Sequence, residues 1–141
     1  MRKLTAWCDG SIKVNPGGRA VGAWVLRDAD VLVSQGTIDL GVKPGNTVNC
    51  AEYAAVEHLL IWIKATQVSW DLLEVNTDSK LVVKQLNAEW KCVYPHLIAY
   101  RDRINSICRE LKLAHKKVTF RWIPREENKE ADKLSKSLYE S

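Results

Sequence analysis

The chain has 141 residues, of which 46% are hydrophobic, and this length and composition suit one compact domain with a continuous core. No apolar run approaches the roughly 20 residues that a membrane span requires, and the first residues hold no apolar signal-peptide core. We therefore expect a single domain over residues 1–141, in a soluble, cytoplasmic protein that has no membrane partner. The cysteines lack the close pairs of a zinc site and the density of a disulfide scaffold, so free thiols are expected at Cys8, Cys50, Cys92 and Cys108.

The charge is modest but uneven. Lys and Arg total 21 against 17 Asp and Glu, a formal net charge of +4, and the excess gathers near the C-terminal end. Such a stretch attracts polyanions, although a solvated helix face explains it equally simply. Its members are Lys112, Lys116, Lys117, Arg121, Arg125, Lys129, Lys133 and Lys136.

Three short apolar segments open the chain, at Leu4–Cys8, Ala20–Leu26 and Val31–Ile38. The first two are separated by the Asn-Pro-Gly-Gly turn at Asn15–Gly18, and no segment of helical length lies between any of them. They therefore predict three strands of an antiparallel meander.

The period then changes to that of a helix. From Asn49 onward, six residues lie on one face at helical spacing and predict a helix that faces the core. They are Ala51, Ala54, Ala55, His58, Leu59 and Trp62. A strand at Leu72–Asn76, helices at Ser79–Leu86 and Leu97–Leu113 and a strand at Val118–Ile123 follow. An amphipathic final helix is expected to pack on the sheet through Ala131, Leu134 and Leu138. This order predicts an α/β fold with a mixed sheet.

Four acids occupy positions that each have an ordinary structural explanation. Asp9 precedes Gly10 in a typical turn pair, and Glu52 lies three residues after Asn49, the spacing of a helix-capping pair. Asp78 could cap the helix that begins at Ser79. Asp132 could form a surface ion pair with Lys136.

Their placement is not explained in this way. Asp9 and Asp78 each follow a predicted central strand, where ligand sites of α/β sheets lie, and helix-borne Glu52 and Asp132 could lean towards them. Converging carboxylates repel one another unless cations neutralise them, and oxygen ligands favour Mg²⁺ or Mn²⁺. Two such ions can activate a water and stabilise the leaving oxygen of a phosphodiester, so phosphoryl chemistry is predicted. His58, on the apolar face, is interpreted as a core residue.

Four motifs that contain these acids, CDGSIKVNPGG, NCAEYAA, NTDSKLVVKQLNAEW and WIPREENKEADKLS, resemble the signature blocks of type 1 ribonuclease H, in order and over nearly the whole chain. The resemblance implies a ribonuclease H-like fold, in which helices flank a five-stranded mixed sheet, a meander followed by parallel strands. It also implies cleavage of the RNA strand of an RNA/DNA hybrid with two Mg²⁺ ions, leaving 5′-phosphate and 3′-hydroxyl ends. By the same resemblance, Asp9, Glu52, Asp78 and Asp132 are the metal-binding catalytic residues, and Asp9 bridges both ions.

The family pattern also suggests substrate contacts. Gly10 and Ser11 would present groups to the RNA, Asn15 and Asn49 would approach the minor groove, and Thr47 would hold a phosphate of the DNA strand. Contacts of this kind read the 2′-hydroxyl and the backbone, so little sequence preference is expected. No small organic cofactor is expected, and the chain is interpreted as a monomer that stands free of a larger polyprotein.

Two features depart from many bacterial members. Residues from Trp90 to Leu97 are too few for their basic protrusion, which leaves Trp90 either packed on DNA sugar or buried. Arg125 stands where those members carry a histidine; it could contact phosphate or remain a solvent-exposed arginine. Protrusion-lacking members have similar arginine-containing versions, so we interpret the chain as a variant enzyme.

Two other functions stay open at this point. A hybrid-binding module that has lost catalysis would retain hybrid without Mg²⁺-dependent cleavage. A relative on the same fold, such as an integrase or junction resolvase, would act on DNA without needing a 2′-hydroxyl.

Overall fold

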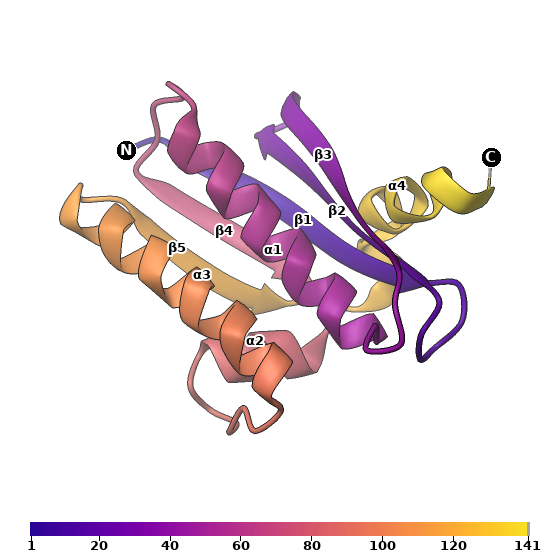
Figure 1. Cartoon of the computed structure of the whole chain (residues 1–141). Coiled ribbons are helices and arrows are strands. Elements are labelled where there is room, and N and C mark those ends of the chain that lie inside the picture. Colours follow the sequence, from indigo (N-terminus) through magenta and orange to yellow (C-terminus); the bar gives the residue numbers. More distant parts are fainter. Residues whose placement is uncertain (141) are drawn as a thin grey trace.

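A five-stranded mixed sheet forms the centre of the computed structural model, which describes residues 1–140, with side chains described through Leu138 (Figure 1). The spatial strand order is β3-β2-β1-β4-β5. Strands β1 to β3 pair antiparallel, whereas β1 with β4 and β4 with β5 pair parallel, so the predicted mixed sheet is confirmed. The bounds are β1 Lys3–Ile12, β2 Arg19–Asp28, β3 Val31–Val42, β4 Leu72–Thr77 and β5 Lys117–Trp122.

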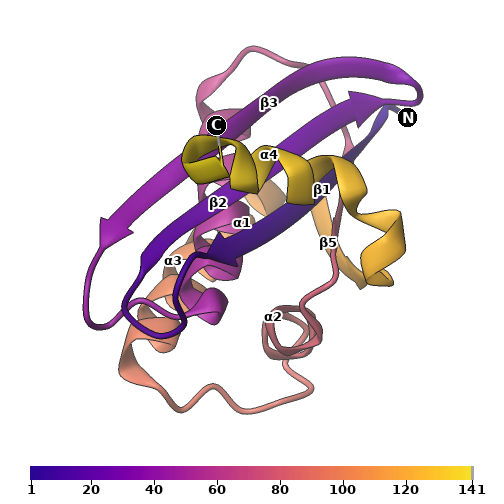
Figure 2. The same ribbon diagram turned by 90° about the vertical axis from the view of Figure 1, so that its right-hand side faces the viewer.

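Helices cover both faces of this sheet. α1 and α3 lie on one face and α4 crosses the other, with α2 near the end of β4 (Figures 1 and 2). Their bounds are α1 Val48–Ala65, α2 Lys80–Leu86, α3 Pro95–Leu113 and α4 Lys129–Glu140, and a short 3₁₀ turn, η1 Arg125–Glu127, precedes α4. None of the helices in this part of the chain is long and apolar enough to cross a membrane.

Strand β1 is longer than the sequence predicts. Asp9 and Gly10 were expected to form a turn, but they pair with Ala23 and Gly22 of β2 inside the sheet, so the turn interpretation is wrong. The chain reverses only over residues 13–18, where Gly18 N–H donates to Val14 O at 2.7 Å. Pairing with β2 on one side outweighs the local preference of an Asp-Gly pair.

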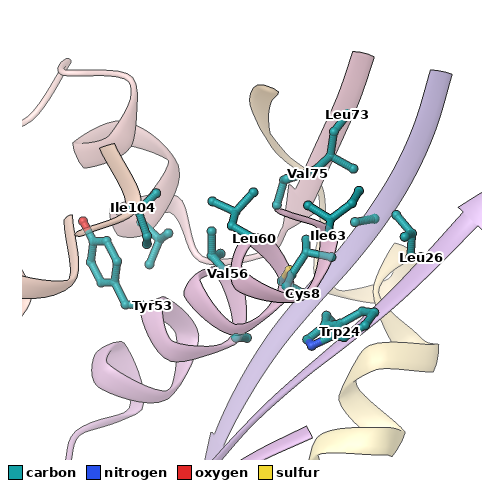
Figure 3. Packing of buried hydrophobic residues seen from close by; sticks show 14 of the residues in the cluster. Cys8, Trp24, Leu26, Tyr53, Val56, Leu60, Ile63, Leu73, Val75 and Ile104 are labelled. Atoms are coloured by element: carbon teal, nitrogen blue, oxygen red, sulfur yellow. The ribbon is translucent and has the colours of Figure 1, made fainter. Parts of the chain in front are cut away.

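The main core lies between the sheet and α1. Figure 3 shows Val56, Leu60 and Ile63 of α1 directed towards Leu73 and Val75 of β4. All five side chains are buried, as the helical spacing predicted for this face of α1. Burial of such a continuous apolar layer is the main force that holds the helix on the sheet.

Two glycines let α1 approach the sheet closely. Gly10 and Gly22 are paired across β1 and β2. A Cβ on Gly10 would stand 2.3 Å from Glu52 N, and one on Gly22 would stand 2.8 Å from Ala55 N. Backbone therefore meets backbone here, and the first turns of α1 sit directly above Gly10.

Helix α4 covers the opposite face of the sheet, where it contacts β1 and β2. Ala131 is fully buried, as predicted, but Leu138 is 43% exposed, so the prediction that it packs on the sheet is wrong. Ser135 takes a buried position instead. An ion pair between Arg27 of β2 and Glu130, at 2.7 Å, also links α4 to the sheet.

The remaining sequence interpretations concern single residues. All four cysteines are free, as expected. Nδ1 of His58 accepts a hydrogen bond from the Trp24 indole at 2.8 Å, and burial lowers the pKa of this imidazole. His58 is therefore a structural residue of the Trp24 side of α1, as predicted.

Candidate active site

The register of the parallel pair brings the two aspartates together. Cys8 of β1 lies opposite Thr77 of β4, so Asp9 and Asp78 follow at the same level of the sheet. β4 ends at Thr77, whereas β1 continues because β2 still pairs with it. Asp9 therefore lies inside β1, next to the point where β4 ends. The sequence had suggested that Asp9 follows the end of its strand.

Glu52 reaches this point from α1. Its Oε2 accepts a hydrogen bond from Gly10 N–H at 3.0 Å, and the side chain is buried. The close approach of α1 over Gly10 makes this contact possible. The capping alternative is wrong, because Thr47 is the N-cap and its hydroxyl accepts from Cys50 N–H.

Three of the predicted acids converge. One carboxylate oxygen from each of Asp9, Glu52 and Asp78 can be chosen so that all lie within 4.8 Å of one another. Asp78 does not cap α2, whose N-cap is Ser79. Oxygen atoms at these separations, from three separate elements, form a geometry that can hold a divalent cation.

Asp132 also lies close to Asp9 and interacts with its carboxylate. It lines the same cavity from α4 and also forms the predicted ion pair with Lys136, at 3.3 Å. Asp132 therefore forms the surface ion pair and also lies in the site. Lys136 lines the cavity as well, so its ammonium lies at the edge of the carboxylate cluster.

The four acids share an open cavity of about 510 Å³. Elements β1, α1, β5 and α4 contribute to its wall, together with the segments after β1, β4 and β5. The other residues that line it are Gly10, Ser11, Ile12, Asn15, Val48, Trp122, Arg125 and Lys136.

The electrostatics of the cluster favour protons or cations. Burial, followed by the neighbouring Asp132 and Asp78, raises the pKa of Asp9 to about 8. Burial and the charges of Asp9 and Asp78 also raise the pKa of Glu52 well above its ordinary value, against a smaller lowering by the Gly10 N–H. Confined carboxylates that repel one another are stabilised by a bound cation, so the donor set fits a metal.

Two buried polar residues support the acids, and the sequence analysis gave neither a role. Asn128, within the PREEN motif, donates from Nδ2 to Cys8 O at 2.8 Å and to Asp78 Oδ1 at 3.5 Å. Ser135 Oγ lies 2.8 Å from Asp132 O and 3.4 Å from Asp9 Oδ2. Their only sequence signal is their position beside Asp132, because polar residues in an amphipathic helix ordinarily face water.

The predicted substrate contacts fall into two groups. Gly10, Ser11, Asn15 and Arg125 line the cavity, and Asn15 and Arg125 are exposed there. Thr47 and Asn49 are half-buried beside Val48, which lines the cavity in their place. Asn46, which the sequence analysis did not single out, is buried and ties the turn before β2 to the end of β3 by donating to Gly18 O and Gly41 O.

Comparison with known proteins identifies the fold. A family model described as reverse transcriptase-like matches residues 7–138. The crystal structure of RNase H1 from the halophilic archaeon Halobacterium salinarum NRC-1 is similar at a TM-score of 0.82 and 32% identity, over 99% of this chain and 99% of that one. The chain belongs to the type 1 ribonuclease H family.

Three further proteins are similar to this chain. Ribonuclease HI of Halobacterium salinarum is 35% identical over 134 residues, which cover 94% of this chain and 62% of that protein. LC11-RNase H1, crystallised in complex with an RNA/DNA hybrid, gives a TM-score of 0.81 at 28% identity over 93% of this chain and 92% of that one. The chain also spans only 39% of the uncharacterised Bacillus subtilis protein YpeP, with 33% identity over 65% of this chain.

The departures from the family pattern are visible in the structure. Residues 87–94 alone join α2 to α3, so no protrusion is inserted there. Trp90 lies in this connection and is 48% exposed, so the alternative of a buried Trp90 is wrong. Arg125 lies in η1, on the rim of the carboxylate cavity, and its position is compatible with phosphate contact.

Proposed function

We propose that this chain is a metal-dependent ribonuclease H that cleaves the RNA strand of RNA/DNA hybrids, leaving 5′-phosphate and 3′-hydroxyl ends. The observation that carries the proposal is the convergence of Asp9, Glu52 and Asp78 within 4.8 Å in an open cavity. Family membership and the hybrid complex of LC11-RNase H1 support the choice of substrate.

Asp9, Glu52, Asp78 and Asp132 are the groups that would hold two Mg²⁺ ions, with Mn²⁺ as the expected substitute. All four line one cavity, and oxygen is their only donor atom. Bound there, two such cations would supply activation of a water and stabilisation of the leaving oxygen of the phosphodiester. The carboxylates of Asp132 and Asp78 both interact with that of Asp9, so Asp9 would be the central ligand of the set.

The protein itself positions these acids. The Gly10 N–H fixes the Glu52 carboxylate, while Asn128 ties Cys8 of β1 to Asp78. Ser135 links Asp9 to α4. Each of these hydrogen bonds removes a rotamer choice before substrate arrives, which lowers the entropy cost of assembling the site.

Residues at the rim would contact the hybrid. Asn15 and Arg125 are exposed on the cavity and suit the sugar edge and a phosphate, respectively. Ser11, Thr47 and Asn49 remain proposed contacts, and so does Gly10, although its N–H already donates to Glu52. Because such groups read the backbone, sequence preference should be slight.

The deciding experiment uses one end-labelled sequence as RNA/DNA hybrid, duplex RNA and duplex DNA, each with Mg²⁺, with Mn²⁺ and with chelator. We expect cleavage only in the RNA strand of the hybrid, and none with chelator. Binding of hybrid without cleavage would indicate a binding module, and cleavage of duplex DNA would indicate a DNA-acting relative.

The Asp78→Asn variant tests the site directly. We expect loss of cleavage with the fold retained, because the amide keeps the shape of the side chain and removes its charge. Circular dichroism and urea unfolding check the fold. Asp102→Asn is the matched control, because Asp102 is an exposed acid of α3 whose ion pair, with Arg101, lies on the surface. Full activity of Asp78→Asn would contradict the assignment.

A further inference from the structure

A second cavity, of about 750 Å³, lies where α3 ends and β5 begins. Lys117 lines it at the start of β5, whereas Trp122, at the end of the same strand, lines the carboxylate cavity. Five residue steps of a strand separate the two by about 16 Å. In Figure 1 this end of α3 and β5 lies on the far side of the sheet from α4. The second cavity is therefore separate from the proposed active site.

Its lining is basic. Five side chains are Arg, Lys or His, and no acid contributes; the basic members are Arg109, Lys112, His115, Lys116 and Lys117. The chain reversal after α3 brings them together. His115 has a φ of 61°, and Lys116 N–H donates back to Leu111 O at 3.0 Å, which places the start of β5 beside the last turn of α3.

The nearby acids have other partners. Glu110 pairs with Lys64, and Glu74 pairs with Lys3 at 3.6 Å. The Asp71 carboxylate accepts from Arg2 N–H at 2.6 Å. Among the residues that the structure describes, no ion pair includes any of the four Lys and Arg side chains of this cavity.

The helix end alone does not account for this cluster. A helix C-terminus carries the equivalent of about half a negative charge, which favours one nearby cation. Four Lys and Arg side chains in one cavity exceed that charge several-fold. Lys116 is also held in place, because its ammonium lies 5.2 Å from the ring centroid of the buried Trp70. The cavity therefore gathers several positive charges, one of them held against Trp70, and none of its Lys or Arg side chains forms an ion pair within the described part of the chain.

We propose that this cavity is an anion-binding site for a ligand with adjacent phosphate groups. Arginine and lysine together suit phosphate, and the volume falls in the range of small-ligand pockets. Two sources share this chemistry, namely the phosphate chain of a free nucleotide or polyphosphate and the backbone of a nucleic-acid strand. The site goes beyond the proposed ribonuclease activity and needs neither the carboxylates nor their metals.

The test maps amide shifts by NMR on the whole chain, with chelator present and about 0.1 M salt. The probes are inorganic tripolyphosphate and a short oligothymidylate, added separately. We expect saturable shifts centred on Lys112 and on residues 115–118. The Arg109→Gln, Lys112→Gln double variant should weaken binding about tenfold or more.

A second double variant, Lys43→Gln with Lys129→Gln, changes the net charge equally at exposed positions outside the cavity. It should bind as the unmodified chain does. Equal weakening in both variants, or shifts that avoid residues 115–118 with both probes, would overturn the proposal. Response to tripolyphosphate alone identifies a small-anion site, response to the oligonucleotide alone identifies a strand site, and both support the phosphate chemistry.

Discussion

Asp9 and Glu52 are carboxylic acids held almost out of water, with only 4% and 8% of their surfaces exposed. Isolated burial of two such charges is costly, and repulsion from Asp78 adds to the cost. The carboxylate cluster therefore destabilises the fold most when its acids bind neither protons nor cations. This conflict is a feature of a binding site and has no evident structural benefit.

The Asp9→Asn variant should be more stable than the unmodified chain at pH 8 in chelator, by an amount on the order of a few kcal/mol. The folded-state pKa of Asp9, about 8, is raised above the unfolded value of about 3.9. Its protonated form therefore stabilises the fold at low pH, and this contribution is lost as the pH rises towards 8. Urea unfolding at pH 5 and pH 8 measures the difference, which should shrink at the lower pH.

Asp102→Asn, on the surface of α3, is the control and should change stability little at either pH. An Asp9→Asn variant that is less stable than the unmodified chain at pH 8 would contradict the electrostatic account of the cluster.

The acids of the site were easier to predict from the sequence than the two polar residues that hydrogen-bond to them. Asp9, Glu52, Asp78 and Asp132 were identifiable because each stands near a predicted strand end or helix start. Asn128 and Ser135 were not, because their role depends on the angle at which α4 crosses β1, which no local pattern encodes. Whether a polar residue of an amphipathic helix faces water or a site is decided by tertiary packing.

Among the elements, α1 determines where Glu52 stands. Its first turns rest on Gly10 and Gly22, so the height of the helix above the sheet is set by the absence of two side chains. The Gly10 N–H then meets the Glu52 carboxylate. Packing and site geometry therefore depend on the same residue.

Gly10→Ala should destabilise the fold by about 1–3 kcal/mol and lower cleavage of hybrid as well. The new methyl group would occupy space 2.3 Å from Glu52 N, so α1 must move away and carry Glu52 with it. Urea unfolding and a cleavage assay measure the two effects.

Gly45→Ala is the matched control, since a Cβ there has nothing within 4 Å. It should stay within about 0.5 kcal/mol of the unmodified chain. If Gly10→Ala behaves in the same way, the close approach does not determine the position of α1.

Element types were predictable, and their ends were less so. Each predicted strand and helix is present, because apolar periods of two and 3.6 residues distinguish them. β1 extends past the Asp-Gly pair since β2 stays hydrogen-bonded to it. α3 begins at Pro95, not at Leu97, because proline fits the first helical position, where no N–H is needed.

For the whole molecule, the carboxylate cavity joins four parts of the chain that are distant in sequence. β1, α1, the end of β4 and α4 each supply one acid. A cation that binds these acids contacts elements on both faces of the sheet at once. Metal binding is therefore coupled to global folding and not only to local order.

Mg²⁺ should raise the free energy of unfolding, and by more at pH 8 than at pH 5. At a free concentration 100-fold above Kd the increase is about 2.7 kcal/mol. Protons compete at low pH, because the pKa of Asp9 is about 8 and that of Glu52 is also raised. Urea titrations followed by tryptophan fluorescence measure it, and the Asp78→Asn variant should gain less. An equal gain at both pH values would contradict proton competition.

The parallel pairing of β1 with β4 also fixes the distance of each aspartate from the start of its strand. Lys3 is aligned with Leu72, and Asp9 lies as far beyond Lys3 as Asp78 lies beyond Leu72. A one-residue insertion or deletion in either strand would move its aspartate out of line with the other and reverse the face on which the following residues lie. Turns such as residues 87–94 carry no such constraint. Over evolutionary time, length variation is therefore expected in the connections, while the lengths of β1 and β4 up to the two aspartates stay constant.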